Sequence, residues 1–413
     1  MLKFHHDFSL NESNEHLALM DKAYEAVKEE NESGQIGYYR LPKETLSIVE
    51  AVSGSELYLD SAIENIVVIG IGGSSLGIKA IMQMLPSDSV KPVYFLENSD
   101  PVNISEIFSK IKKSNTAFIV ISKSGGTIET TSIFKVAIEY FNIDLDSEDS
   151  KKIVAITDGG SSLSKFADEY GIVQYNIPLN VGGRFSVLSA VGIVPLVLAG
   201  FNATAILNGA EEFMQSFFDR REDHLLRKAL YYTQNSDKEC MNVIFSYASN
   251  MENLSKWYVQ LWGESLGKIS KSGKKVGLTP IGLIGSTDQH SFLQLIMEGP
   301  RDKTVTFINV DDFQNSLSVP NITLKHIEKT DFINNHSFNE LINAQCSATK
   351  ESLIQSGISV DSITYDKVDE ENIGATIIYY ELLTSICGLM LDINTYNQPG
   401  VELGKTILEK KFK

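Results

Sequence analysis

The chain has 413 residues, a formal net charge of −17, 43% hydrophobic residues and 22% charged residues. This length predicts two domains, and the composition is typical of a soluble globular protein with a sizeable core. The negative charge, without a cluster of five basic residues, argues against nucleic acid or an anionic membrane surface as a partner. A small anion is not excluded, because distant charges are screened and local donors decide its binding.

The cysteines predict a reducing compartment. Cys240, Cys346 and Cys387 are widely spaced, and none stands at metal-ligand spacing from a histidine or another cysteine. They are expected as buried thiols, which indicates a cytoplasmic protein without a metal site. The first residues lack the apolar core of a signal peptide, and the most apolar stretch, 187–199, is shorter than the ~20 residues of a membrane span. We expect a buried helix there.

Residues 1–47 are predicted to form a helical N-terminal arm, on apolar positions such as Leu17 and Val27. From residue 48 to 200, apolar runs alternate with segments of helical spacing. Such alternation is typical of a mostly parallel sheet with helices on both faces, a three-layer α/β domain. The expected strands are 66–71, 93–96, 117–121 and 153–156, and the expected helices are 76–85, 104–111, 128–141 and 162–170.

A second alternation occupies residues 201–395 and predicts a second α/β domain. The segment 202–234 has helical character. The expected strands are 243–247, 276–278 and 305–310, and the further helices are 254–266, 292–297, 338–355 and 373–391. Residues 396–413 are expected to form a turn and a closing helix.

The first glycine-rich turn, GIGGSSLG at 70–77, follows a strand and opens a helix. Glycines let the backbone approach an anion closely, and the amides at a helix start can donate to it. A dinucleotide fingerprint is an alternative, with Glu97 as the ribose-binding acid, but Ser75 stands where the third glycine belongs. A tight turn without a ligand is the third interpretation, and this segment alone leaves all three open.

The second turn favours phosphate. ISKSGGTIET at 121–130 also follows a strand and begins a helix, and it carries three hydroxyls, a lysine and two glycines. A phosphate monoester needs several donors converging on one dianion. Lys123 precedes the glycines, unlike the lysine of a Walker A loop, so hydrolysis of a nucleoside triphosphate is disfavoured. The alternative is an N-capped helix with Thr127 as its cap and no ligand.

Two further segments carry candidates for the chemistry. Arg184 follows two glycines ahead of an apolar helix, and an arginine there can hold a developing oxyanion without losing its charge. Gln260 and Glu264 stand one helical turn apart, beside Trp257 and Trp262. A carboxylate in aromatic surroundings can be a tuned proton acceptor. Taken in isolation, these would be a solvated loop arginine and a surface glutamate.

Two basic residues complete the candidates. His290 stands at the expected start of a helix, where the positive end of the dipole disfavours imidazolium and a neutral ring could move a proton. Lys405 is brought to a fixed place by the turn that begins at Tyr396. Each of these residues, taken alone, is more often a solvated side chain.

In this order, the segments resemble the glucose-6-phosphate isomerase (phosphoglucose isomerase) family in its compact bacterial form. The segments that carry the resemblance are VIGIGGSSLG, ISKSGGTIET, VGGRFSVLSAVG, WGESLGK, STDQHSF and NQPGVELGK. The resemblance implies two sugar-isomerase-type domains, a homodimer, and no metal or organic cofactor. It implies reversible isomerisation of glucose 6-phosphate and fructose 6-phosphate through ring opening and a cis-enediol(ate), in glycolysis and gluconeogenesis.

The resemblance also implies where the substrate binds. The hydroxyls of Ser122, Ser124 and Thr127 would hold the phosphate, with Lys123 contributing backbone. Gly73 and Ser74 would line the sugar. Gln260 and Gln398 would be further site residues.

The catalytic roles follow from the same resemblance. Glu264 would carry the proton between the second and first carbons, and Arg184 would stabilise the enediolate. Lys405 and His290 of the partner subunit would assist ring opening. The lead-in to His290, Thr-Asp-Gln, differs from the Gly- or Asn-rich lead-in of other family members.

Two rival functions remain to be tested. One is a module that senses a phosphosugar, but such regulators carry a basic DNA-binding segment that this acidic chain lacks. The other is a nicotinamide-dependent oxidoreductase, against which Ser75 argues.

Overall fold

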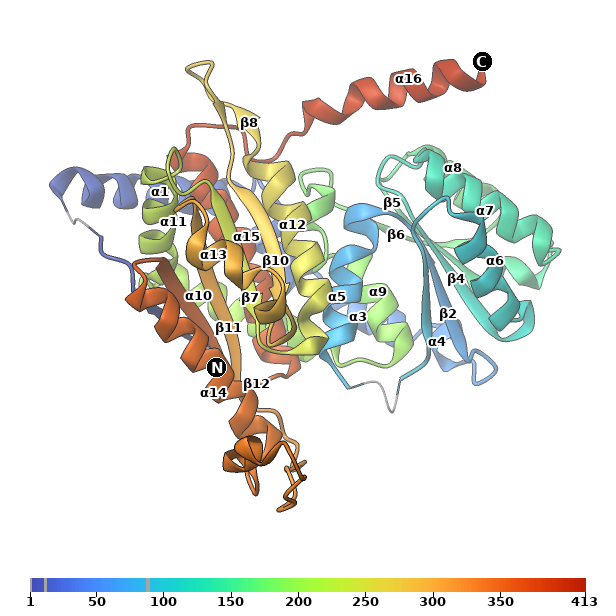
Figure 1. The fold of residues 1–413 in the computed structure, drawn as a ribbon. Coiled ribbons are helices and arrows are strands. Elements are labelled where there is room, and N and C mark those ends of the chain that lie inside the picture. The colour runs from blue at the N-terminus through green and yellow to red at the C-terminus, as the bar shows by residue number, and fades with distance from the viewer. Residues whose placement is uncertain (1, 11–12, 87–89) are drawn as a thin grey trace.

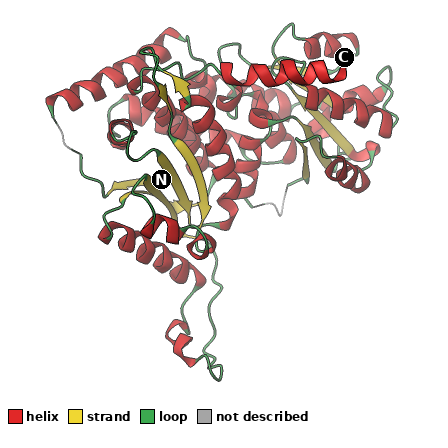
Figure 2. Ribbon diagram, turned by 45° about the horizontal axis from the view of Figure 1, so that its top comes forward, coloured by secondary structure: helices red, strands yellow, loops and turns green. Residues whose placement is uncertain are grey.

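The computed structural model describes residues 2–10, 13–86 and 90–413. Two five-stranded sheets lie at opposite sides of the molecule, with one group of helices between them and further helices on the outer face of each (Figure 1). Figure 2 shows the same arrangement with strands in yellow and helices in red. The chain is therefore built from two α/β units that share a central layer of helices.

The first sheet is wholly parallel and has the order β3-β2-β4-β5-β6. Its middle strands are Val/Ile-rich and buried on both faces, as expected of a covered parallel sheet. The strands are β2 (Asn65–Ile69), β3 (Val93–Leu96), β4 (Thr116–Ile121), β5 (Ile153–Thr157) and β6 (Val173–Asn176).

Helices cover both faces of this sheet. Every residue of α9 (Ala190–Ala199) is buried, which confirms the helix expected from the apolar stretch. On the inner side, α9 packs against α3 (Leu46–Ser53) and α5 (Leu76–Met84). The outer face carries α6 (Pro101–Lys110), α7 (Ile128–Tyr140) and α8 (Ser162–Glu169).

The second sheet has the order β1-β12-β11-β7-β10, and only β1 is antiparallel. Its strands are β1 (Lys3–His6), β7 (Met241–Ser246), β10 (Thr279–Ile284), β11 (Lys303–Asp312) and β12 (Ser359–Lys367). A small hairpin of β8 (Lys268–Ile269) and β9 (Lys275–Val276) follows the helix before β10.

The second sheet is also covered on both faces. The central layer contains α1 (Asn14–Ser33), α10 (Ala203–Phe218), α11 (His224–Gln234), α12 (Glu252–Leu266) and α15 (Glu370–Met390). Helix α15 is long and apolar enough to cross a membrane by length and composition, but 83% of its most apolar window is buried inside the fold. It is the central helix of the core. The outer face carries α13 (Leu293–Glu298) and α14 (Phe338–Gln355).

The structure contains strands that the sequence pattern did not indicate. The N-terminal segment begins with β1, which pairs Phe4 with Ile363 of β12. Strands β6 and β12 were not expected, and the strand expected at 276–278 overlaps the end of β9 and stops before β10. Pro280 is accommodated in β10 because β10 is an edge strand, and proline is excluded only from central strands.

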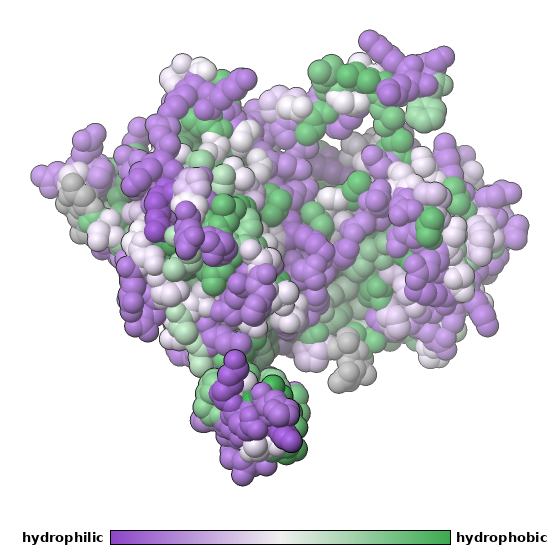
Figure 3. Space-filling model, in the orientation of Figure 1, coloured by the Kyte–Doolittle hydropathy of each residue, from purple (hydrophilic) through white to green (hydrophobic). Residues whose placement is uncertain are grey.

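Two segments project from the body. Helix α16 (Glu402–Phe412) has no buried residue, and Leu403 and Phe412 are 70% and 87% exposed. The excursion 313–337 between β11 and α14 extends away from the second sheet and exposes Phe332 by 80%. Figure 3 shows apolar residues on both projections. Large exposed apolar side chains on protruding segments mark surfaces for association.

Candidate active site

The two glycine-rich turns lie side by side. Strands β2 and β4 are neighbours and parallel, so the segments that follow them emerge at the same edge of the sheet. Gly70 directly follows β2, and a Cβ there would lie only 3.1 Å from the carbonyl oxygen of Ile121 at the end of β4. Gly72 and Gly125 adopt φ values of +62° and +71°, a region that favours glycine. The glycines therefore allow both turns to form at one place.

The second turn leaves a helix start open. Thr127 is the N-cap residue of α7, but its side chain makes no capping hydrogen bond. Its hydroxyl instead lies 3.0 Å from the hydroxyl of Ser122. Ser124 is exposed at the same turn, and the buried Oγ1 of Thr130 has no hydrogen-bond partner within the described residues. Uncapped amides and nearby hydroxyls at a helix N-terminus can bind an anion.

Lys123 connects the second turn to the turn that carries Arg184. Its Nζ donates to the carbonyl oxygens of Leu179 and Val181, at 3.0 and 2.7 Å. The hydroxyl of Thr157 donates to the carbonyl of Ser122 at 2.7 Å and anchors the turn from below. The ammonium of Lys123 therefore holds two backbone segments together.

The first turn also packs against the turn that carries Arg184 (the arginine turn). A Cβ on Gly73 would lie 2.2 Å from the carbonyl oxygen of Gly183, so only glycine permits this approach. Ser74 is half-buried beside it. A Cβ on Gly72 would lie 2.9 Å from Nε2 of Gln260. The first turn, the arginine turn and helix α12 thus converge.

Arg184 lies at the centre of this convergence and is 2% exposed. Its Nε donates to Oγ of Ser265 at 2.6 Å, and its Nη1 donates to Oε1 of Gln398 at 2.9 Å. Its Nη2 donates to the carbonyl oxygens of Thr395 and Asn397, at 2.5 and 3.2 Å. Four acceptors from two distant segments fix the plane of the guanidinium.

The carboxylate of Glu264 lies beside this guanidinium. Its Oε2 is 3.5 Å from Nη1 of Arg184, and its Oε1 accepts from Nε2 of Gln260 at 3.3 Å. The side chain of Glu264 is 33% exposed, whereas that of Arg184 is 1% exposed. Burial lowers the pKa of Arg184, and the neighbouring Glu264 opposes that shift, so the arginine stays cationic at neutral pH. A carboxylate open to the solvent beside a fixed cation can accept a proton from a bound molecule.

The tryptophans do not surround Glu264 as expected. Trp257 and Trp262 are buried, 2% and 0% exposed, and Nε1 of Trp262 donates to Oδ1 of Asn242 at 3.0 Å. Two residues along a helix turn the direction by about 200°, so Trp262 points away from Glu264. Trp257 lies on the same side of α12 as Glu264 but two turns earlier, about 10 Å along the axis, so the two rings do not surround the carboxylate.

A cavity of about 630 Å³ opens beside the Arg184–Glu264 pair. It is lined by Glu264 and Gln398, and also by Lys268 and Lys275 of the small hairpin. Burial and the charge of Arg184 lower the pKa of Lys268 to about 8. Ser265 and Lys268 were not singled out from the sequence, although both lie in the WGESLGK segment.

The N-terminal segment supports the loop that carries Gln398. The hydroxyl of Tyr396 donates to Oε2 of Glu30 at 2.5 Å and lies 3.0 Å from the hydroxyl oxygen of Ser385. The hydroxyl of Tyr39 donates to the same Glu30 oxygen at 2.8 Å. Burial raises the pKa of Glu30. Residues expected to be only a packing arm therefore position one side of the site.

His290 and Lys405 lie apart from this centre. His290 ends a short 3-10 turn, Thr287–His290, ahead of α13 and is exposed. Lys405 projects from α16, where its Nζ pairs with Oε1 of Glu402 at 2.8 Å and its side chain is 63% exposed. Neither residue contacts Glu264 or Arg184 in this single chain.

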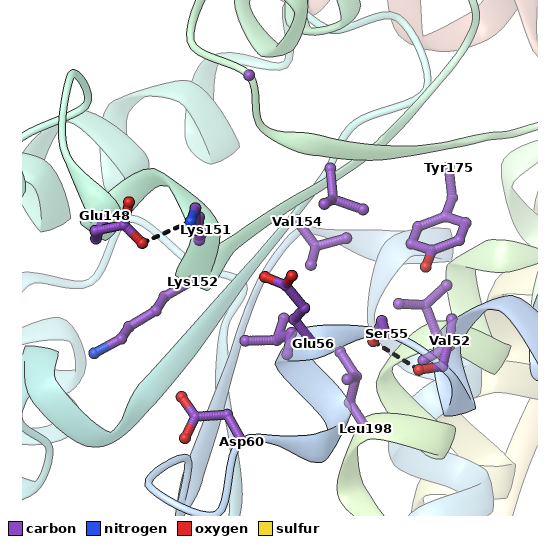
Figure 4. A pocket seen from close by; sticks show the side chains of 14 residues that line it. Val52, Ser55, Glu56, Asp60, Glu148, Lys151, Lys152, Val154, Tyr175 and Leu198 are labelled. Atoms are coloured by element: carbon purple, nitrogen blue, oxygen red, sulfur yellow. Dashed lines mark hydrogen bonds and ion pairs between the residues drawn. The ribbon is translucent and has the colours of Figure 1, made fainter.

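A second cavity, of about 540 Å³, lies at the amino ends of β5 and β6 (Figure 4). Its walls include Val154, Tyr175 and Leu198, and an ion pair between Lys151 and Glu148 lies at its rim. It contains none of the residues expected to bind substrate or to act in catalysis. The chemistry expected from the sequence lies at the opposite, carboxyl edge of the sheet. No group of three potential metal ligands occurs among the described residues.

The fold and the site define the class. The structure of the tagatose-6-phosphate ketose/aldose isomerase of Escherichia coli aligns with a TM-score of 0.54 at 11% identity, over 93% of this chain and 95% of that one, which shows a shared fold. A glucose-6-phosphate isomerase structure from Chlamydia trachomatis aligns with a TM-score of 0.82 at 22% identity, over 100% of this chain and 88% of that one. This is the two-sheet architecture of sugar isomerases.

The chain belongs to the phosphoglucose isomerase family, whose model matches residues 8–412. The glucose-6-phosphate isomerase of Campylobacter jejuni is 45% identical over 386 residues, which cover 93% of each chain. That of Rubrobacter xylanophilus is 33% identical over 384 residues, which cover 90% of this chain and 88% of the relative.

Proposed function

We propose that this chain interconverts glucose 6-phosphate and fructose 6-phosphate, with Glu264 as the base. The observation that carries the proposal is the pair formed by Arg184 and Glu264, a fixed buried cation 3.5 Å from a carboxylate that remains partly open. A proton on the carbon beside a carbonyl is weakly acidic, and its removal leaves an anion. Such a step needs both a positioned base and a cation at the developing charge.

The proton balance requires no outside reagent. Glu264 would take the proton from the second carbon of the open-chain aldose, and the electron pair would form the enediolate that Arg184 stabilises. The same carboxyl group would return the proton to the first carbon, and a hydroxyl proton would move to the other oxygen. Substrate and product are isomers, so nothing is oxidised or reduced overall.

The second turn would hold the phosphate. The hydroxyls of Ser122, Ser124 and Thr127 surround the uncapped start of α7, and this arrangement supports binding of a dianion. Gly73 and Ser74 on the first turn, with Gln260 and Gln398, would line the sugar between the phosphate and Glu264. Binding energy from the phosphate would thus hold the reacting carbons against the base.

Lys123 would act through its backbone at the phosphate and through its side chain at the arginine turn. Its ammonium joins the turn 122–127 to residues 179 and 181. Movement of one turn would therefore move the other. This connection would keep the phosphate site and the Arg184 site at a constant separation.

Ring opening would require a homodimer. His290 and Lys405 are exposed and lie away from the centre, while α16 and the excursion 313–337 expose apolar side chains that include Phe332 and Phe412. Packing of these projections on a second copy would remove that apolar surface from water. The proposal is that His290 of the partner subunit completes each site, and that Lys405 closes over it.

A mixing experiment tests this donation. Glu264→Gln and His290→Asn are each expected to be inactive as homodimers, and co-expression should give mixed dimers with one complete site. We expect about a quarter of wild-type activity, since half of a random mixture is mixed and each mixed dimer has one good site. Recovery that stays at the level of the two separate variants, with mixed dimers shown by mass spectrometry, would exclude donation.

The cell compartment belongs to the same proposal. Cys240, Cys346 and Cys387 carry free thiols, and all but the half-exposed Cys240 are buried. Free thiols fit a reducing compartment, which supports a cytoplasmic enzyme of glycolysis and gluconeogenesis.

The direct test is formation of glucose 6-phosphate from fructose 6-phosphate by the purified chain, followed in an assay coupled to a glucose-6-phosphate dehydrogenase. We expect turnover without added metal. A sensing module would bind fructose 6-phosphate without turnover, and a nicotinamide enzyme would show saturable binding of NAD or NADP by tryptophan fluorescence. Either result, with no isomerisation, would replace the proposal.

A further inference from the structure

Lys268 closes the end of the helix that carries Glu264. It begins β8 and is separated from the end of α12 by the C-cap residue Gly267. Its Nζ donates to the carbonyl oxygen of Glu264 at 2.5 Å and to that of Ser265 at 2.9 Å. The last carbonyls of a helix lack partners within the helix and form the negative end of its dipole. An ammonium in this position therefore stabilises the final turn of α12.

Lys268 also belongs to the wall of the site. Lys268 lines the 630 Å³ cavity together with Glu264 and Gln398. A lysine ammonium has three donor hydrogens, and the two carbonyls account for two of them. One donor is left for a molecule bound in the cavity.

The charges around Lys268 come from each neighbouring segment. Arg184 from the arginine turn and Glu264 from α12 act on it electrostatically, in opposite directions. Lys275 lines the cavity from β9 and is exposed. Half-burial has the largest effect and, with Arg184, lowers the pKa of Lys268 to about 8. The ammonium is therefore charged at neutral pH and neutral well above pH 8.

We propose that Lys268 is a positioning residue for the proton transfer. It holds the last turn of α12, and with it Glu264, and it places a second positive charge beside Arg184 on the side of the cavity where the anionic intermediate forms. This inference rests on the proposed role of Glu264. It adds a residue outside the set derived from the family resemblance.

The test compares Lys268→Met and Lys268→Arg with the wild-type chain across the pH range. Met keeps the length without the charge, and Arg keeps the charge at every accessible pH. We expect Lys268→Met to lower kcat roughly tenfold, less than the 10²–10³ of a lost direct oxyanion donor, with little change in KM. Lys256→Met is the matched control, because Lys256 is an exposed lysine of the same helix paired with Glu252, and its kcat should be unchanged.

The pH profile separates positioning from a merely structural role. Wild-type kcat should fall as pH rises through about 8, where the Lys268 ammonium is lost. Lys268→Arg should move that fall upward by at least about one pH unit, and Lys268→Met should remove it. Loss of structural support alone would lower the melting temperature and leave the shape of the profile unchanged.

Two results would overturn the inference. One is a Lys268→Met variant with kcat within about twofold of wild type and the same profile. The other, decisive even if that variant does not fold, is a Lys268→Arg profile that superimposes on wild type. Glu264→Gln is measured in parallel: if it stays active, the role of Glu264 itself fails, whereas an inactive Glu264→Gln beside unaffected Lys268 variants rejects only the role of Lys268.

Discussion

Two cation–carboxylate pairs with a buried cation are built differently. Lys228 and Asp361 lie in the second sheet and its inner helix layer, 2.7 Å apart and both 1% exposed, and the hydroxyl of Thr306 bonds to each. Arg184 and Glu264 lie 3.5 Å apart, and the carboxylate is 33% exposed. In the first pair both charged groups are buried and bonded to each other and to Thr306. In the second pair part of the carboxylate surface remains open to a bound molecule.

The first arrangement contributes to the stability of the fold, whereas the second allows the carboxylate to take part in chemistry. A buried pair that satisfies all its partners stabilises the fold only while both members remain, because either one alone is an unpaired charge in the core. A cation held by other acceptors does not need the carboxylate next to it for its own hydrogen bonds. Arg184 has four such acceptors, so Glu264 can change its protonation without disturbing the arginine.

The largest effect on turnover is expected at the Arg184–Glu264 pair. Glu264→Gln should lower kcat by about 10²–10⁴-fold or more, because the amide cannot accept the proton, while the melting temperature stays near wild type. Steady-state kinetics and calorimetry measure the two. Glu252→Gln, an exposed change in the same helix, is the control and should keep full activity. Turnover near wild type in Glu264→Gln would remove the base from the mechanism.

A substitution in the Lys228–Asp361 pair should lower stability rather than turnover. Asp361→Asn leaves the Lys228 ammonium buried without its counter-charge, and we expect a loss of about 3–5 kcal/mol in the free energy of unfolding. The turnover of the remaining folded protein should change little. Urea unfolding measures the loss. The control is Asp237→Asn, which should cost less than about 1 kcal/mol, because the Asp237 side chain is 84% exposed in its ion pair with Lys274. Equal losses of unfolding free energy in both variants would show that the buried pair contributes no more to stability than the exposed pair.

His224, which lies next to the Lys228–Asp361 pair, should make stability depend on pH. His224 lies 3.6 Å from Asp361 and accepts or donates a hydrogen bond with Tyr379 at 3.0 Å. Burial lowers the pKa of His224 to about 4, below its ordinary value of 6.5. The neutral ring is therefore favoured by folding, and its contribution is present above pH 6.5 and lost as the pH falls toward 4.

His224→Phe keeps a ring that does not titrate. The loss of unfolding free energy between pH 7 and pH 4 should be smaller in this variant, by up to roughly 3 kcal/mol. The comparison uses urea unfolding at both pH values. Parallel pH dependence in the two proteins would show that the ring does not titrate in this window.

The smallest effect is expected at the turn 122–127, at the start of α7. Thr127→Val removes one hydroxyl from the start of α7, and a hydrogen bond to a charged group contributes about 1.5–3 kcal/mol. We expect KM for fructose 6-phosphate to rise by roughly ten- to a hundredfold with a smaller change in kcat. Thr131→Val, one turn further along, is the control, because the Thr131 hydroxyl is engaged by the backbone carbonyl of Thr127. An unchanged KM in Thr127→Val would place the phosphate elsewhere.

Local pattern predicted much of the fold. The Val/Ile runs and the glycine-rich turns that follow them indicated the parallel strands, and helical spacing indicated α9, α12 and α15 close to their observed bounds. Strands β1 and β12 escaped notice. Lys3–His6 has too few residues for a period-two pattern, and its place is decided by pairing with a strand more than 300 residues away.

The site was predicted in part. Gln260 and Glu264 share a helix face because of their spacing, and the structure bonds them to each other and places Glu264 beside Arg184. The error about Trp257 and Trp262 came from treating sequence neighbours as spatial neighbours. Residue chemistry offered His290 and Lys405 as candidates, the family resemblance assigned them to ring opening, and a single chain leaves both exposed.

The amino-acid sequence by itself determined the local devices: glycines where the backbone must turn, hydroxyls at a helix start, and an amide and a carboxylate one helical turn apart. These depend on backbone geometry and spacing within a few residues. Only the tertiary structure decided that Arg184 meets Ser265, 81 positions away, and Gln398, 214 positions away. Such contacts arise from the packing of two sheets around a shared layer of helices, which no local pattern encodes.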